Sequence, residues 1–253
     1  MFYRLGTIVI NFFYELGAIF WYTLTIFGYL LKGKIHARNT VEQMIVIGFN
    51  SLPIIFISSL FVGMVFAVQV VKEFLNFGAA QMVGGVVGLA MWRELAPIMT
   101  GIVVAGRSGA GISAELGTMK VTEQIEALEA MSQDPMKYLI TPRFIACTLM
   151  LPLLTGLGDI IGFFGGLLVA IGTNQVDARA FIYSAERMLD VNDITGGLIK
   201  AVFFGMIIAI ISTYMGLNAK SGAKGVGETA TKSVVLILVL LFITNYFLSV
   251  VLF

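Results

Sequence analysis

Five long apolar stretches decide what this chain can fold into. Each contains about 20 or more residues with few charges, which is the length that an α-helix needs to cross the hydrocarbon of a bilayer. The five stretches are residues 44–71, 80–106, 144–172, 194–217 and 233–253. Only 12% of the 253 residues are charged, and mean hydropathy is +0.94. This charged fraction is about half that of a soluble domain, so the sequence predicts an all-α polytopic membrane protein with one domain, residues 1–253.

A sixth apolar run, residues 8–31, differs from the others in its aromatic content. It contains Asn11 and Glu15 together with eight aromatic residues. Aromatic rings favour the headgroup level of a membrane, so we expect this run to be an interfacial helix that lies along the surface. The domain then divides into an interfacial helix and elbow, residues 1–40, and a transmembrane core, residues 41–253. A sixth span is the alternative.

Lysine and arginine are distributed unevenly between the two sides that five spans define. Ten lie on one side, and only Lys72, Arg179 and Arg187 lie on the other. Loops that face the cytoplasm are enriched in these residues. Residues 107–143 and 218–232 are therefore predicted to face the cytoplasm, and residues 173–193 to face outward.

Glycines recur at a spacing of four residues in two of the spans. They are Gly158, Gly162 and Gly166 in one span and Gly84 and Gly88 in another. Small residues at this spacing allow helix backbones to approach each other, so both runs are expected to be packing faces.

Charged residues also occur inside the predicted second span. Arg93 and Glu94 are adjacent near its middle, where each charge costs about 2.5–3.5 kcal/mol. Adjacent residues point in different directions on a helix, so each charge needs a partner on another helix or a wet cavity. Pro97 has no N–H, which predicts a kink and an unbonded carbonyl oxygen at Arg93. We expect Glu94 to pair with Lys200 and line a cavity, with Asp159 as a further intramembrane polar partner; a purely structural clamp is the alternative.

The one long polar stretch, residues 107–143, lies between the second and third spans. From residue 122 onward, two stripes at helical spacing run along it, one apolar and one acidic. The apolar stripe is Ile125, Leu128 and Met131, and the acidic stripe is Glu123, Glu126 and Glu129. Asp134-Pro135 and Thr141-Pro142 each suit an N-cap followed by a proline in the first turn. Lipid headgroups and a soluble subunit are the two candidate surfaces for the apolar stripe; a solvated loop is the simpler interpretation.

The chain shows no cluster of catalytic or metal-binding residues. Cys147 and His36 are each the only residue of their type, which excludes a disulfide framework and a cysteine metal site. Residues 28–34 have the spacing of a phosphate-binding loop, but Ile35 replaces the magnesium-binding Ser or Thr and no strand precedes them. We expect a non-catalytic chain with no cofactor, no metal and no nucleic-acid partner, so any ATP chemistry belongs to another chain.

Several motifs between residues 93 and 143 resemble one family closely. They are Arg93-Glu94-Leu95-x-Pro97, Ala105-Gly106-Arg107-x-Gly109, the run AELGTMKVTEQIEAL from Ala114 to Leu128, Asp134-Pro135 and Pro142-Arg143. Together they resemble the MlaE/YrbE permease family, and the similarity extends from about residue 40 to the end of the sequence. One departure is Ala96, where many members have glycine.

The resemblance implies a homodimer in the bacterial inner membrane that moves glycerophospholipids between that membrane and the periplasmic path to the outer membrane. Two ABC-type ATPases, which carry ATP and magnesium, would bind beneath it. A ring of MCE-domain proteins would lie on the periplasmic side, and a small STAS-type protein can accompany the ATPase. The alternatives are a gradient-driven secondary transporter that uses Arg93, Glu94 and Lys200 as a relay, and a structural membrane anchor.

The resemblance also implies two sets of functional residues. A coupling helix at about residues 118–131 would dock into the ATPase. The residues expected to couple are Glu115, Thr118, Thr122, Glu123, Ile125, Glu126 and Leu128. A lipid cavity at the dimer interface would be lined by Phe66, Phe74, Phe77, Arg93, Glu94 and Leu95. The alternative for the phenylalanines is that they face bulk lipid or the protein core.

Overall fold

A computed structural model describes residues 2–33, 36–172 and 176–253. Within these ranges the regular structure is helical, and five helical segments are long and apolar enough to span a membrane. The five segments are Ala37–Asn76, Ala80–Val121, Met136–Gly172, Val191–Leu217 and Gly222–Leu252. The predicted all-α fold with five spans is therefore confirmed.

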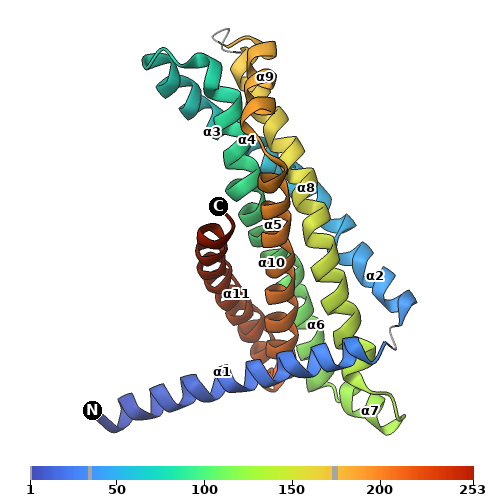
Figure 1. The fold of residues 1–253 in the computed structure, drawn as a ribbon. Coiled ribbons are helices and arrows are strands. Elements are labelled where there is room, and N and C mark those ends of the chain that lie inside the picture. Colours follow the sequence, from blue (N-terminus) through green and yellow to red (C-terminus); the bar gives the residue numbers. More distant parts are fainter. Residues whose placement is uncertain (1, 34–35, 173–175) are drawn as a thin grey trace.

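Helix α1 (Phe2–Leu31) lies across one end of this bundle and is not among the five segments (Figure 1). Its second half is anchored to the bundle: Ile26 is buried, and Tyr22 donates a hydrogen bond to Thr213. Most of the described aromatic side chains of its first half are exposed. This placement is compatible with an interfacial helix, which stays a prediction.

Several spans consist of consecutive helical pieces. Span one contains α2 (Ala37–Ile47), η1 (Phe49–Ser51) and α3 (Leu52–Asn76). Span two contains η2 (Ala80–Met82), α4 (Val83–Ala90), the π-helix η3 (Met91–Leu95), α5 (Ala96–Val104), the π-helix η4 (Ala105–Gly109) and α6 (Ala110–Val121). Span three contains the π-helix η5 (Met136–Ile140) and α8 (Thr141–Gly172), and span four is α10 (Val191–Leu217). Span five is α11 (Gly222–Leu252), while α7 (Gln124–Ala130) and α9 (Ala178–Met188) connect spans at opposite ends (Figure 1).

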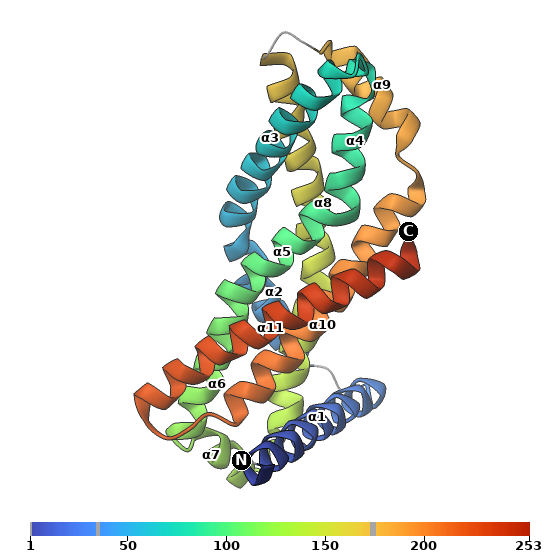
Figure 2. The same ribbon diagram turned by 90° about the vertical axis from the view of Figure 1, so that its left-hand side faces the viewer.

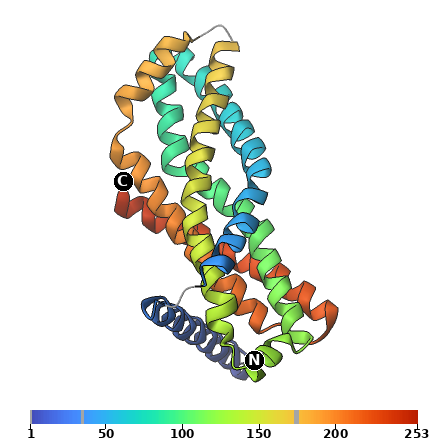
Figure 3. The same cartoon turned by 90° about the vertical axis from the view of Figure 1, so that its right-hand side faces the viewer.

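Both glycine runs lie where helix backbones touch, as predicted. A Cβ atom added to Gly63 of α3 would lie 1.9 Å from the carbonyl oxygen of Gly162, so α3 and α8 meet backbone to backbone. One added to Gly84 would lie 1.9 Å from the carbonyl oxygen of Phe181 in α9. Figure 3 shows α8 running the length of the bundle beside α3. The transmembrane core is thus held by close contacts that no larger residue permits.

The second span is longer than the sequence indicated. Residues 107–121, which we expected in the polar insert, continue it as η4 and α6. Ile112 and Leu116 are buried in the main core, and the hydroxyl of Ser113 donates to the carbonyl oxygen of Ser212 at 2.8 Å. Because α10 and α11 cover one face of α6, this polar sequence forms part of the bundle.

An intramembrane ion network as the candidate functional site

The second span adopts a π-helix immediately before Pro97. Proline cannot donate to the carbonyl oxygen of Arg93, and the π turn over residues 91–95 is the local response. The carbonyl oxygen is not left unbonded, because Lys200 Nζ donates a hydrogen bond to it at 2.8 Å. The need of this carbonyl oxygen for a partner, predicted from Pro97, is thus confirmed, while the predicted kink stays a prediction.

Lys200 also pairs with Glu94. Its Nζ lies 2.7 Å from Glu94 Oε1 and 2.8 Å from Ser249 Oγ. The carboxylate accepts two further hydrogen bonds, from Ser249 Oγ at 2.7 Å and from Asn245 Nδ2 at 2.9 Å. The Lys200 side chain is fully buried, whereas 40% of the Glu94 side chain is exposed. The predicted ion pair is therefore present, with its acidic end at the surface of the chain.

Arg93 has a partner that the sequence did not indicate. Its Nε and Nη2 atoms both lie 2.7 Å from Asp193 Oδ1. Asp193 is buried and closes a capping box with Asp190 at the start of α10. Both acids fall within residues 173–193, which the sequence predicts to face outward; the capping-box spacing before the apolar run is the sequence signal that they begin a helix.

The contact between η3 and α10 depends on one small residue. A Cβ atom on Gly197 would lie 2.1 Å from the carbonyl oxygen of Trp92. The adjacent Gly196 faces the ring of Phe253, whose centroid lies 4.7 Å from Arg93 Cζ and 4.9 Å from Lys200 Nζ. Such cation–π contacts favour both charges within the membrane. Figure 2 shows α5, α10 and α11 side by side around this site.

Asp159 lies outside this network. It is 1% exposed in α8, and none of the network's ion pairs or hydrogen bonds includes it. Its Oδ1 atom has no hydrogen-bond partner among the described residues, and the buried hydroxyls of Thr100 and Thr155 share this property. Its role as a partner of the paired charges stays a prediction.

The other residues predicted to line a lipid cavity lie in two places. Phe66 and Phe74 of α3 and Leu95 of η3 are half-buried around one hydrophobic cluster. Phe77 follows α3 and is 81% exposed. The structure thus brings Phe66, Phe74 and Leu95 together and leaves Phe77 apart.

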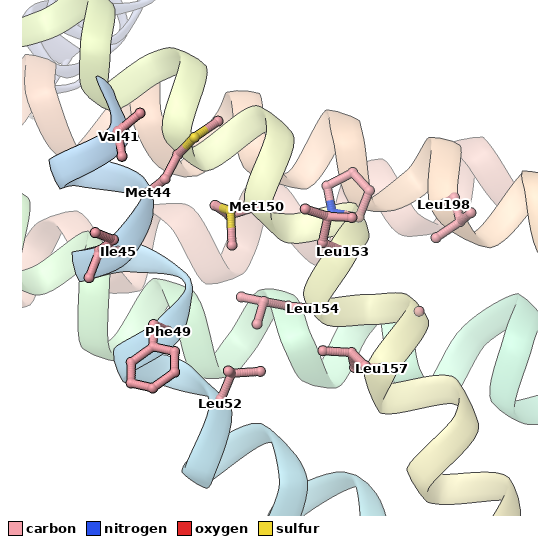
Figure 4. Close-up of a pocket in the computed structure, with 12 residues that line it drawn as sticks. Val41, Met44, Ile45, Phe49, Leu52, Met150, Leu153, Leu154, Leu157 and Leu198 are labelled. Atoms are coloured by element: carbon pink, nitrogen blue, oxygen red, sulfur yellow. The ribbon is translucent and has the colours of Figure 1, made fainter. Parts of the chain in front are cut away.

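A separate apolar pocket of about 640 Å³ lies between the first and third spans (Figure 4). Met44 and Phe49 line one wall, and Met150, Leu153 and Leu157 of α8 line the other. None of the six residues predicted for the lipid cavity lines this pocket. The predicted cavity would lie between two protomers, so a single chain does not enclose it.

The segment predicted as a coupling helix is divided. α6 ends at Val121, Glu123 adopts a left-handed backbone conformation with φ 59°, and α7 then begins at Gln124. The expected range of residues 118–131 therefore contains the end of α6 and the separate helix α7, and its role as a coupling helix stays a prediction. Its apolar stripe is divided as well: Ile125 is buried and Leu128 packs against the chain's own core, whereas Met131 is 64% exposed. Only Met131 is left for a partner or lipid headgroups to cover.

The predicted coupling residues outside that stripe lie mainly on the surface. The hydroxyls of Thr118 and Thr122 donate to carbonyl oxygens one turn earlier in the chain. Glu126 pairs with Lys120, and this hydrogen bond holds the pKa of the Glu126 carboxyl below its usual value. Glu123 is exposed at the turn. An acidic, solvent-facing surface therefore remains available at this end of the bundle.

A buried arginine connects this surface to the bundle. Arg143 is 3% exposed, its Nη2 lies 2.9 Å from Glu115 Oε1, and its Nη1 donates to the carbonyl oxygen of Leu139. The pair joins α6 to α8. Asp134 accepts a hydrogen bond from the Met136 N–H at 2.9 Å, which confirms that it caps span three.

The second N-cap that we predicted is wrong. Thr141-Pro142 lies inside the continuous helical segment Met136–Gly172, and the Thr141 hydroxyl bonds to the carbonyl oxygen of Met136. The π-helix η5 immediately precedes Pro142. As at Pro97, a π turn lets the helix continue through a residue that lacks an N–H.

Comparisons with known proteins agree with this architecture. A family model described as Permease MlaE matches residues 40–251. A probable ABC transporter permease protein of Synechocystis sp. is 46% identical over 95% of this chain and 92% of its own length. A probable ABC transporter permease protein of Rickettsia typhi is 42% identical over 88% of this chain and 86% of its own. The chloroplastic protein TRIGALACTOSYLDIACYLGLYCEROL 1 of Arabidopsis thaliana is 45% identical over 87% of this chain and 63% of its own. The chain belongs to the MlaE permease family and is a multi-pass ABC transporter permease.

Proposed function

We propose that this permease moves glycerophospholipids between the bacterial inner membrane and the periplasmic path to the outer membrane, driven by ATP. Two copies would form the transport path, and ABC ATPases beneath them would hydrolyse ATP. An MCE-domain ring on the periplasmic side and a STAS-type protein on the ATPase would complete the assembly. The Arabidopsis relative, which carries the name of a diacylglycerol lipid, supports a lipid cargo.

The observation that carries this proposal is the ion network around Glu94. Charges in the membrane interior occur mainly at functional sites, because hydrocarbon does not solvate them. Here Lys200 is fully buried while the Glu94 carboxylate is partly exposed on the protomer surface. A carboxylate with fixed hydrogen bonds, close to the apolar residue Leu95, suits a molecule with a charged headgroup and hydrocarbon tails.

A continuous helical segment connects this network to the end of the bundle that we predict to face the cytoplasm. Ala80–Val121 is one helical segment, so α6 continues directly into the part of the span that carries Arg93 and Glu94. Glu115 and Arg143 join α6 to α8 near α7. A force applied by an ATPase at α7 would therefore reach η3 through packed helices.

The acidic surface at α7 provides the test of coupling. Replacing Glu126 with lysine breaks the pair with Lys120 and reverses a charge on the surface proposed for docking, and we expect lipid-stimulated ATP hydrolysis by the assembled complex to fall about ten-fold, because the docked ATPase loses charge complementarity. Both side chains are about half exposed, so the thermal unfolding temperature should change little. Hydrolysis is measured on complexes purified with their ATPase.

Glu73→Lys is the matched control, because Glu73 is an exposed carboxylate at the opposite end of the bundle. Hydrolysis that is unchanged in Glu126→Lys would count against an ATPase at this surface. Leu128→Asp is not a suitable variant, because Leu128 packs against the core and its loss would unfold the segment.

A further inference from the structure

A pocket of about 680 Å³ lies where α1 approaches α10 and α11. Charged and apolar side chains both line it, whereas the pocket between spans one and three is lined by apolar residues. Four segments meet at it: α1 contributes Tyr14 and Glu15, α10 contributes Tyr214, the segment after α10 contributes Lys220, and α11 contributes Glu228 and Lys232. None of these residues belongs to the ion network around Glu94.

Four of these side chains carry charges that form no ion pair with the residues that the structure describes. Among the described residues, none of Glu15, Lys220, Glu228 and Lys232 forms an ion pair within 4.0 Å. Glu228 and Lys232 are one helical turn apart, a spacing at which a surface pair readily forms. Two cations and two anions that line one pocket without pairing leave both kinds of charge available to a ligand.

The position of the pocket favours a lipid. It adjoins α1, whose exposed aromatic residues Tyr14 and Trp21 suit the headgroup level. From Lys232, exposed apolar residues continue along the same face of α11, at Val235, Val239 and Phe242. A charged pocket that opens onto an apolar helix face has the polarity of a phospholipid, with its headgroup in the pocket and its chains along α11.

We propose that this pocket binds the phosphoethanolamine headgroup of a phospholipid in the leaflet beside α1. Lys220 and Lys232 bind the phosphate, and Glu15 and Glu228 accept hydrogen bonds from the primary ammonium. A phosphatidylglycerol headgroup has no cation for the carboxylates, and a choline ammonium has no N–H to donate. The site requires that α1 lies along the membrane, but it does not require that the bound lipid is transported.

Native mass spectrometry of the full chain tests this site. The chain is released from vesicles that contain equal amounts of phosphatidylethanolamine, phosphatidylcholine and phosphatidylglycerol, and the lipids that it retains are identified. The wild-type chain should retain phosphatidylethanolamine in preference to the other two. Glu15→Gln with Glu228→Gln should reduce that preference about ten-fold while phosphatidylglycerol binding persists, because only the ammonium loses its charge-assisted contacts. Lys220→Gln with Lys232→Gln should reduce retention of both lipids.

The controls remove one positive or one negative charge, the same signs that the double variants remove, but at residues outside the pocket. Lys224→Gln and Glu73→Gln change exposed residues that do not line it, and both should retain lipid as the wild type does. Glycerophosphoethanolamine, which has no acyl chains, should bind about ten-fold more weakly than the lipid, since the apolar contacts are missing. Equal binding of that soluble molecule, or lipid retention that is unchanged in both double variants, would overturn the proposal.

Discussion

Replacing Lys200 with methionine is expected to abolish lipid transport and to lower the stability of the permease. The substitution leaves the Arg93 carbonyl oxygen without a donor and the Glu94 carboxylate without its cation. Removal of one partner of a buried ion pair costs about 3–5 kcal/mol. Glu94 is 40% exposed, so solvent screens part of this loss and we expect the lower end of that range. Thermal unfolding in detergent and ATP-dependent transfer by the reconstituted complex measure the two effects.

A double variant separates stability from function. Glu94→Gln with Lys200→Met removes both charges but leaves the Arg93 carbonyl oxygen without its donor, so it should regain part of the unfolding temperature but not the transport. A Lys200→Met protein that unfolds and transports like the wild type would contradict the network's importance. Exchange of the two charges is a weaker test, because a glutamate at position 200 would face the carbonyl oxygen of Arg93 with no proton to donate.

Replacing Gly63 with alanine is expected to have the second large effect. The added Cβ would lie 1.9 Å from the carbonyl oxygen of Gly162, and the obstacle is backbone rather than a flexible side chain. Overpacking in a core typically costs about 1–3 kcal/mol. We expect a loss of unfolding free energy at or above the upper end of this range, because α3 and α8 must separate before the methyl group fits. The unfolding temperature and the yield of monodisperse protein report the loss.

Gly106→Ala is the matched control within the same bundle. A Cβ atom on Gly106 has nothing within 4 Å, so the same chemical change should leave stability close to that of the wild type. If Gly63→Ala and Gly106→Ala unfold at the same temperature, the backbone contact between α3 and α8 does not contribute as described.

The sequence predicted those features of the fold that follow from local chemistry. Apolar length identified the five spans, and Pro97 predicted a carbonyl oxygen in need of a donor, although the π-helix beside it was not predicted. The pairing of Glu94 with Lys200 was also predictable, since a buried charge must find an opposite charge and few are present in the other spans.

The features that the sequence did not predict depend on long-range packing. Arg93 finds Asp193 only because Gly197 lets α10 approach η3 closely. Residues 107–121 are polar enough to suggest a loop, but α10 and α11 bury one side of them as a helix. Ile125 likewise packs on the chain's own core, although its helical spacing gave no indication of which surface would cover it.

The most direct test of the central claim is phospholipid transfer by the permease reconstituted with its ATPase and periplasmic ring. Labelled phospholipid should leave donor vesicles only while ATP is hydrolysed, and Lys200→Met should stop that transfer. Transfer that continues without ATP and follows an imposed ion gradient would contradict an ATP-driven lipid permease.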